Sequence, residues 1–491
     1  MRGRCLHRAR WRVFGRGDWD LPARCWRRSG LIVAAAVALL AGSSVAAGDV
    51  DAPDPSLSPA ERGYWFLLNR PYFNSDFKEA TFDELWTVWE EPARSEAEKA
   101  DAATRRKLAL SRYGLMELPG RGSNVPLQYV AAPDGGWVTN CFSCHGGKVA
   151  GRVIPGLPNS HVALENMRED LYRYLEKHER LDELADSGMP GVPLGGSNGT
   201  TNSVIFGIAL GSQRDLLLNY VPRKTFPKML HHDHDAPPWW NVKQKKMLYA
   251  DGFAPKAHRA LMPFLMLPQT GPEKFKAWEP DFKDILAYIE SIEAPEYPFS
   301  VDHELAARGQ VAFNRVCAEC HGTYKPGGEY PDGPGGEYPE RNVPIDEVGT
   351  DPLRFQALTP LARGGHQMSW FGEQGKQKVN QYPEGYVAPP LDGIWASGPY
   401  LHNGSVPTLW HLFHADKRPV VWTRTEDGYD QERVGIEVTE LADVPADADL
   451  PVERRRYFDT RLPGKSAAGH EFPEQLTEEE KTAVIEYLKT L

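Results

Sequence analysis

The sequence predicts a mainly α fold in which two related halves are joined by long loops. Three observations support this prediction. The pattern C-x-x-C-H occurs twice, at 141–145 and 317–321. Each half ends with a segment whose apolar residues have helical spacing, 281–292 in the first and 476–491 in the second. A segment that begins with a proline pair is also repeated. The 491 residues allow two to four domains, and 41% hydrophobic with 25% charged residues is typical of a soluble globular protein.

Residues 1–47 have the order of a secretory signal peptide. Nine arginines precede the apolar run LIVAAAVALLA (31–41), and Val45-Ala46-Ala47 fits the cleavage rule, so the mature chain would begin at Gly48. The run is too short to cross a hydrocarbon core of about 30 Å as a helix, although an uncleaved anchor is the alternative. No other stretch is apolar enough to span a membrane. We therefore expect a periplasmic or secreted protein with no membrane span in the mature chain.

The charge of the chain bears on its partners. The net charge is −11, and the leader contributes +7, so its removal would leave −18. Nucleic-acid binding calls for a basic surface, so the acidic net charge argues against nucleic acid as the main partner. An acidic surface suits a basic redox partner protein.

The cysteines indicate covalently attached haem. Apart from Cys5 and Cys25 in the leader, every cysteine belongs to a C-x-x-C-H motif. The two thiols reach the two vinyl groups of one haem, and the histidine becomes the proximal iron ligand. A redox dithiol would not need the histidine, and a zinc site would want further paired Cys or His. The sequence thus predicts two covalently bound haem c groups, held by Cys141, Cys144 and His145, and by Cys317, Cys320 and His321.

The second half is bounded by two predicted helices. The first is HELAARGQVAFNRV (303–316), which follows the turn-rich EAPEYPFS (293–300). The last helix, 476–491, has Thr477 as a suitable N-cap and glutamates in its first turn, where the helix dipole favours them.

The end of the last helix, Tyr487-Leu488-Lys489, resembles that of the class I cytochrome c family, in which the first and last helices cross beside the haem. That family carries its sixth iron ligand, usually methionine, in a loop before this helix. Seventeen residues before Tyr487 this chain holds His470, so the resemblance implies that His321 and His470 are the axial pair of the second haem. A bis-histidine iron suits electron transfer. A surface loop histidine is the alternative.

The first half offers no equivalent ligand. Seventeen residues before Tyr288 lies Gly271. The proline-pair repeat, which runs from Pro237 to Gly252 and from Pro389 to Gly404, places Ala250 opposite His402. We therefore predict an open sixth position on the first haem, able to take dioxygen or peroxide. The site could instead be closed by one of several other residues, namely His161, Met167, His231, His232, His234, His258 or Met262.

The repeated segments PPWWNVKQKKMLYADG and PPLDGIWASGPYLHNGSVPTLWHLF resemble the dihaem cytochrome c peroxidase superfamily. The segment PYLHNGSVPTL, together with AGHEF before the last helix, most resembles the rubber-oxygenase-like dihaem branch. This resemblance covers most of residues 60–491. It implies that the first haem holds dioxygen and the second is bis-histidine. The chain departs from that branch in being shorter, and from a standard peroxidase in lacking the expected methionine near His411 and His414.

Several further residues have more than one possible role. His402 could ligate the second iron, bond a haem propionate or pack in a loop. Trp239, Trp240 and Trp395 could assist electron passage or form an aromatic core, and Phe253 is a candidate distal wall. The run HHDHD (231–235) is either a metal site or a solvated loop. The repeat GGEYPD/GGEYPE within 322–342 indicates a surface insertion, with calcium binding as the alternative.

The sequence therefore predicts a signal peptide (1–47), an N-terminal helical segment (48–130) and two cytochrome c-like haem domains (131–296 and 297–491) with long loops. The expected function is that of a periplasmic dihaem oxidoreductase with peroxidase-like or rubber-oxygenase-like chemistry. Its partners would be a small-molecule oxidant and a redox protein. A pure electron carrier with both irons six-coordinate is the alternative.

Overall fold

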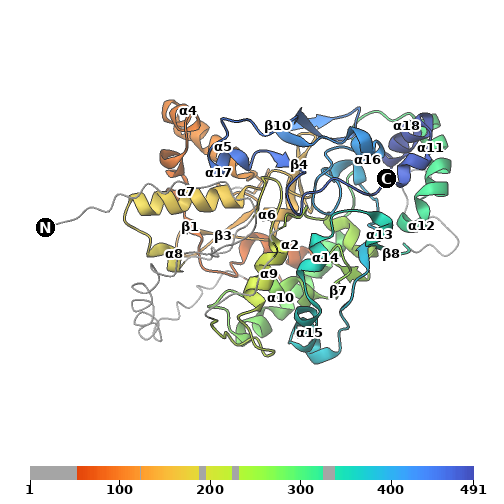
Figure 1. Ribbon diagram of the computed structural model, residues 1–491. Helices are drawn as coiled ribbons and strands as arrows, with labels where there is room; N and C mark the ends of the chain where they lie inside the picture. The colour runs from red at the N-terminus through yellow and green to blue at the C-terminus, as the bar shows by residue number, and fades with distance from the viewer. Residues whose placement is uncertain (1–51, 122, 187–194, 224–229, 231, 325–337) are drawn as a thin grey trace. The chain divides into compact units, whose positions relative to one another are not determined.

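The computed structural model describes residues 52–121, 123–186, 195–223, 230, 232–324 and 338–491 (Figure 1). The described residues belong to the compact unit Val50–Leu491, and everything below concerns that unit. The predicted signal peptide, His231 and most of the GGEYPD repeat lie outside the described residues. Among the described residues, no helix combines the length and apolarity that crossing a bilayer requires.

The prediction of a mainly α fold with two cytochrome c-like domains is wrong. Of the described residues, 42% are helical and 13% form strands or bridges, in several small sheets. Most strands are two to four residues long, which is too short for an alternating pattern to reveal them. The exception is a hairpin whose second strand, GIEVTEL, alternates apolar and polar residues from Ile436 to Thr439, and this short signal was available in the sequence.

The helices are mostly short and are separated by long connections. They are α2 (Pro59–Asn69), α3 (Glu79–Phe82), α4 (Ala93–Lys99), α5 (Ala102–Tyr113), α6 (Phe142–His145), α7 (Leu164–Lys177), α8 (Glu183–Asp186), α9 (Ser203–Gly211), α10 (Pro272–Ser291), α11 (His303–Val316), α12 (Ala318–His321), α13 (Ile345–Val348), α14 (Leu353–Ala357), α15 (Pro360–Met368), α16 (Leu409–Phe413), α17 (Pro451–Arg454) and α18 (Glu478–Leu488).

The strands pair antiparallel in five small sheets. One has the order β1-β3-β2 (Phe77–Lys78, Gly136–Thr139, Tyr129–Ala131), with Val130 opposite Val138. Another has the order β11-β10-β12 (Gly435–Leu441, Val421–Asp430, Phe458–Asp459), with Thr423 opposite Thr439. The remaining pairs are β4 (Gly146–Val149) with β5 (Arg152–Pro155), β6 (Met247–Leu248) with β7 (Ala254–Pro255), and β8 (Asn342–Pro344) with β9 (Gly385–Val387).

Two helix pairs frame the part of the molecule that carries the cysteine motifs. Helix α2 packs along α10, and α11 packs along α18, as Figure 1 shows for the second pair. The predicted helix 303–316 is confirmed, and so is the Thr477 cap of α18, whose side chain accepts from the backbone N–H of Glu480. The turn-rich segment after α10 is non-helical, as its prolines predict.

A glycine lets each helix pair approach closely. A Cβ built on Gly63 of α2 would overlap the carbonyl of Asp284 in α10. A Cβ on Gly309 of α11 would overlap the carbonyl of Ala483 in α18. These contacts join two rigid backbones, so neither glycine can gain a side chain unless the helices separate.

We expect Gly309→Ala to lower the free energy of unfolding by about 1–3 kcal/mol, because the added methyl group overpacks the α11–α18 contact. Chemical denaturation followed by tryptophan fluorescence measures this. Gly364→Ala in α15 is the matched control. Nothing lies within 4 Å of its Cβ, so the change should be neutral or stabilise by roughly 0.5–1 kcal/mol. Equal effects of the two substitutions would contradict the close-packing interpretation.

Candidate functional site

A single cavity of about 860 Å³ brings both C-x-x-C-H motifs together. Each motif closes a one-turn helix, α6 or α12, so its two cysteines and its histidine, at positions i, i+3 and i+4, share one helix face. The lining of the cavity is largely apolar. Burial there raises the pKa of the Cys144 thiol to about 11. The predicted site residues that line it are Cys141, Cys144, His145, Cys317, Cys320, His321, His402 and His470.

The two motif histidines are oriented in the same way. The Nδ1 of His145 lies 3.0 Å from the carbonyl oxygen of Pro237, and the Nδ1 of His321 lies 2.8 Å from that of Pro389. A carbonyl only accepts, so in each ring Nδ1 carries the proton and donates, which leaves the Nε2 lone pair available to a metal. The two prolines are the matched first residues of the sequence repeat. The repeat thus has a physical role, which is to fix the tautomer of both imidazoles.

Burial keeps these imidazoles neutral. It lowers the pKa of His145 to about 4, and it lowers the pKa of His321 as well. Burial, with the nearby His321 and Arg418, lowers the pKa of His470 to about 3. A neutral imidazole is the form that ligates iron. The donor set therefore suits a haem iron.

His321 and His470 face each other. Their ring centres lie 6.2 Å apart. Metal–imidazole bonds are about 2.0–2.1 Å long, so two imidazoles that share one metal have ring centres roughly 6 Å apart. Within the described chain the buried Nδ1 of His470 has no hydrogen-bond partner, as expected of a side chain that awaits another group. The pair fits a group held between them.

The backbone holds His470 in a strained conformation. Its φ is +52°, in the left-handed region that non-glycine residues rarely adopt. Its N–H donates to the carbonyl of Val348 at 2.6 Å, and the preceding Gly469 packs against Gly349. A residue kept in such a conformation by its surroundings is frequently part of a functional site.

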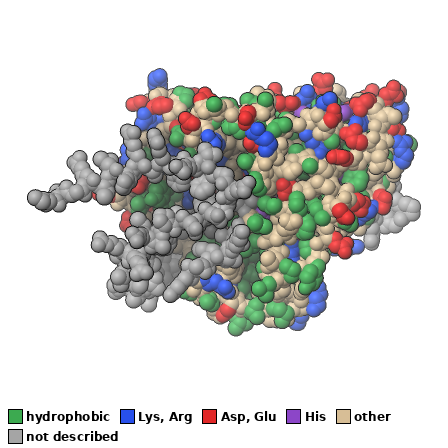
Figure 2. Space-filling model, in the orientation of Figure 1, with side chains coloured by type: hydrophobic (Ala, Val, Ile, Leu, Met, Phe, Trp, Pro, Cys, Tyr) green, Lys and Arg blue, Asp and Glu red, His purple; other side chains and the backbone are tan. Residues whose placement is uncertain are grey.

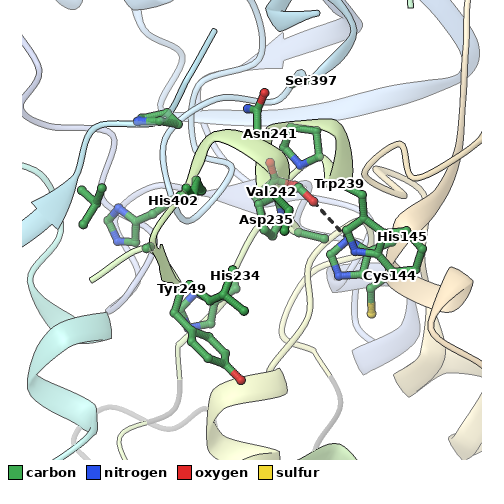
Figure 3. A pocket seen from close by; sticks show the side chains of 18 of the residues that line it. Cys144, His145, His234, Asp235, Trp239, Asn241, Val242, Tyr249, Ser397 and His402 are labelled. Carbon is green, nitrogen blue, oxygen red and sulfur yellow. Dashed lines mark hydrogen bonds between the residues drawn. The ribbon is translucent and has the colours of Figure 1, made fainter. Parts of the chain in front are cut away.

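The surroundings of His145 are different. Its ring stacks on Trp239, with 4.8 Å between centres, and among the described residues no second imidazole makes ring contact with it. Of the other candidate ligands that the structure describes, only His234 lines the cavity. It is 6% exposed, and its Nε2 has no hydrogen-bond partner in the described chain. Figure 3 shows His145 and His402 on either side of the segment that carries Asp235, Trp239 and Val242.

His402 is engaged elsewhere. Its ring stacks on Tyr386, with 4.2 Å between centres, and burial with the nearby Arg354 lowers its pKa to about 3. Its carbonyl accepts from the N–H of Asp235 at 3.0 Å. The remaining candidate ligands, His161, Met167, His232, His258 and Met262, do not line the cavity, and neither does Phe253. The described residues contain no cluster of three or more His, Cys, Asp or Glu side chains able to hold a metal ion.

Two of the three tryptophans of the repeats donate hydrogen bonds to backbone carbonyls. One carbonyl belongs to the other repeat copy, and the other belongs to the turn-rich segment after α10. Trp240 is fully buried and donates its Nε1–H to the carbonyl of Asp392 at 2.7 Å. Trp395 donates to the carbonyl of Pro295 at 2.8 Å. Both belong to the core that also contains Phe313 and Tyr487, the aromatic residues of the α11–α18 pair.

A buried charge cluster that sequence reasoning missed borders the cavity. Asp251 is fully buried and pairs with Arg354, at 3.0 Å, and with Arg363. Arg354 also lines the cavity. Asp251 falls in the first repeat copy, but its arginine partners lie about a hundred residues further along the chain, as the pairing separations of 103 and 112 show. Only the fold brings them together.

Comparisons with known proteins found one family match. Residues 385–423 match the family described as RoxA-like, cytochrome c-like. The match relates the chain to the rubber-oxygenase-like cytochromes c and implies a covalently bound haem c. It contains Pro389, which anchors His321, and His402.

Two relatives come from Sinorhizobium fredii, and both are described as uncharacterized proteins. One, y4iM, is 29% identical over 263 residues, which is 48% of this chain and 56% of the relative. The other, y4iJ, is 31% identical over 248 residues, which is 39% of each chain. The chain thus spans about half or less of the length of these relatives.

Proposed function

We propose that the protein is an exported, periplasmic dihaem c-type oxidoreductase in which the two haems have different tasks. The first would react with dioxygen or peroxide, and the second would pass electrons to or from a redox partner protein. One observation carries the proposal: His321 faces the imidazole of His470 at 6.2 Å between ring centres, whereas His145 has Trp239 at its side and no second imidazole in ring contact among the described residues.

The residues that would hold the groups are the two cysteines and the histidine of each motif, with His470 as the second axial ligand of one haem. Bound haem supplies one-electron transfer and, where its iron is accessible, activation of dioxygen or peroxide. The protein contributes the rest. The carbonyls of Pro237 and Pro389 direct each Nε2 into the cavity, and the apolar side chains of the cavity lining, among them Phe206, Phe264 and Phe282, exclude water.

Reduced protein should bind carbon monoxide at the first haem alone, because His470 occupies the corresponding position at the second. Titration followed by the shift of the visible haem band measures the stoichiometry. We expect one carbon monoxide per two haems. Binding of none, or of two, would contradict the division of tasks.

A pure electron carrier is the second candidate, and His234 is the observation that favours it. Its buried Nε2 lacks a partner in the described chain, and its side chain lines the same cavity as His145. If His234 closed the first site, wild-type protein would bind no carbon monoxide and His234→Ala would gain binding. If the first site is open, the wild type binds and His234→Ala changes the stoichiometry little.

The substrate class follows from two assays on the same preparation. Peroxide turnover with a reduced donor would identify a peroxidase. Oxygen uptake with an isoprenoid would identify an oxygenase, the activity implied by the rubber-oxygenase-like relationship. We favour the oxygenase, because the cavity that contains the first motif is lined mainly by apolar side chains.

A further inference from the structure

We propose that one face of the protein docks on an anionic lipid bilayer. This face, the Leu216 surface, comprises Leu216, Leu217, Tyr220 and Val221 from the loop after α9, and Leu361 and Met368 from α15. All six side chains are exposed, Leu217 to 63% and Leu361 to 86%. Contiguous exposed apolar side chains are costly in water and mark interaction sites. The inference is independent of haem chemistry and goes beyond the proposed function.

The loop is built to hold these leucines outward. The guanidinium of Arg214, itself 9% exposed, donates to the carbonyls of Leu218 at 3.0 Å and of Thr270 at 2.8 Å, and to those of Met266 and Leu267. The Asp215 carboxylate accepts from the N–H groups of Leu217 and Asn219, both at 2.9 Å. Leu218 points inward and is 2% exposed. The exposure of Leu216 and Leu217 is therefore a feature of an ordered turn, with its polar groups satisfied inside.

The loop lies beside the C-terminal end of α15. The N–H of Trp370, two residues after α15 ends at Met368, donates to the carbonyl of Leu216 at 3.1 Å. The guanidinium of Arg259 lies over the Trp370 ring at 4.1 Å and holds that residue in place. The apolar residues from two distant parts of the sequence thus share one face.

The charges around the Leu216 surface favour an anionic partner. Arg223, Lys376 and Lys378 are exposed beside it. Two carboxylates near this surface offset part of that charge: Asp215 caps the turn, and Glu373 accepts from Gln377 at 3.0 Å. In Figure 2 basic and apolar side chains predominate over α15, whereas acidic ones gather on other parts of the visible face. Local basic charge is notable in a chain whose net charge is −11.

Apolar side chains with a basic rim are the combination that binds the interface of an anionic bilayer. The surface also adjoins the cavity, because α9 ends at Gly211 immediately before the loop and its Val204 and Phe206 line the cavity wall. A bilayer docked here would lie beside that wall.

Flotation with vesicles tests the proposal, using exported haem-loaded protein whose N-terminus is established by mass spectrometry to lack the apolar run 31–41. We expect binding to vesicles of phosphatidylglycerol and phosphatidylcholine. Leu216→Ser/Leu217→Ser should weaken it by about tenfold or more. Lys376→Gln/Lys378→Gln should weaken it by roughly fivefold per charge, as should high salt. The matched control is Leu450→Ser/Leu462→Ser, because these leucines are 42% and 48% exposed outside the surface.

Three results would overturn the proposal: no binding to anionic vesicles, equal loss in the control variant, or binding to polyisoprene particles but not to vesicles. The last result would assign the surface to an apolar polymer. Unchanged visible haem spectra in all variants establish that the exposed substitutions leave the fold intact.

Discussion

Replacing His470 with alanine is expected to convert the second haem from low-spin to high-spin. His470 is the imidazole that faces His321, with 6.2 Å between ring centres, and its loss leaves the sixth position to water or nothing. Electron paramagnetic resonance of the oxidised variant should lose the bis-histidine low-spin signal and gain a high-spin one. Added imidazole should restore the low-spin signal, because it can enter the space that the side chain leaves.

His402→Ala is the matched control for this experiment. His402 is also a cavity-lining histidine whose pKa burial lowers to about 3, but its ring stacks on Tyr386. The variant should keep the low-spin signal of the second haem. If His402→Ala became high-spin and His470→Ala did not, the ligand assignment would be reversed.

Asp251→Asn should produce the largest loss of stability. Asp251 and Arg363 are fully buried, and Arg354 is 2% exposed, so removal of the carboxylate charge leaves two buried guanidinium groups without their counter-ion. Breaking a buried pair in this way costs about 3–5 kcal/mol. The midpoint of urea unfolding, followed by tryptophan fluorescence, reports the change.

Asp134→Asn is the control for the charge cluster. Asp134 pairs with Lys78 at 2.6 Å, but the two side chains are 52% and 45% exposed. An exposed pair contributes about 0–1 kcal/mol. If the two variants unfolded at the same urea concentration, the Asp251 cluster would not stabilise the fold as we infer.

Local patterns in the sequence located the three helices that they predicted, although α10 begins at Pro272 and not at residue 281. The range 303–316 coincides with α11, and the cap at Thr477 is formed as its residue types indicate. These features depend on neighbours three or four residues apart, which periodicity and capping preferences record. The fold class was wrong because strands of two to four residues depend on partners elsewhere in the chain.

Parts of the site could be located from spacing, and other parts could not. The two motifs and the proline-pair repeat identified some of the residues that line the cavity, and counting back from Tyr487 singled out His470. The ligation of both irons stays a prediction. The role of the proline carbonyls, the stacking of His402 on Tyr386 and the pairing of Asp251 with Arg354 all require the tertiary structure, since each joins segments far apart in sequence.

Electron paramagnetic resonance of the oxidised wild-type protein tests the proposed division of tasks most directly, because it reports the ligation of both irons at once. We expect one low-spin signal from the iron between His321 and His470, and a second, distinct signal from an iron that has His145 as its protein axial ligand. Two bis-histidine low-spin signals would contradict the proposal and identify the protein as an electron carrier.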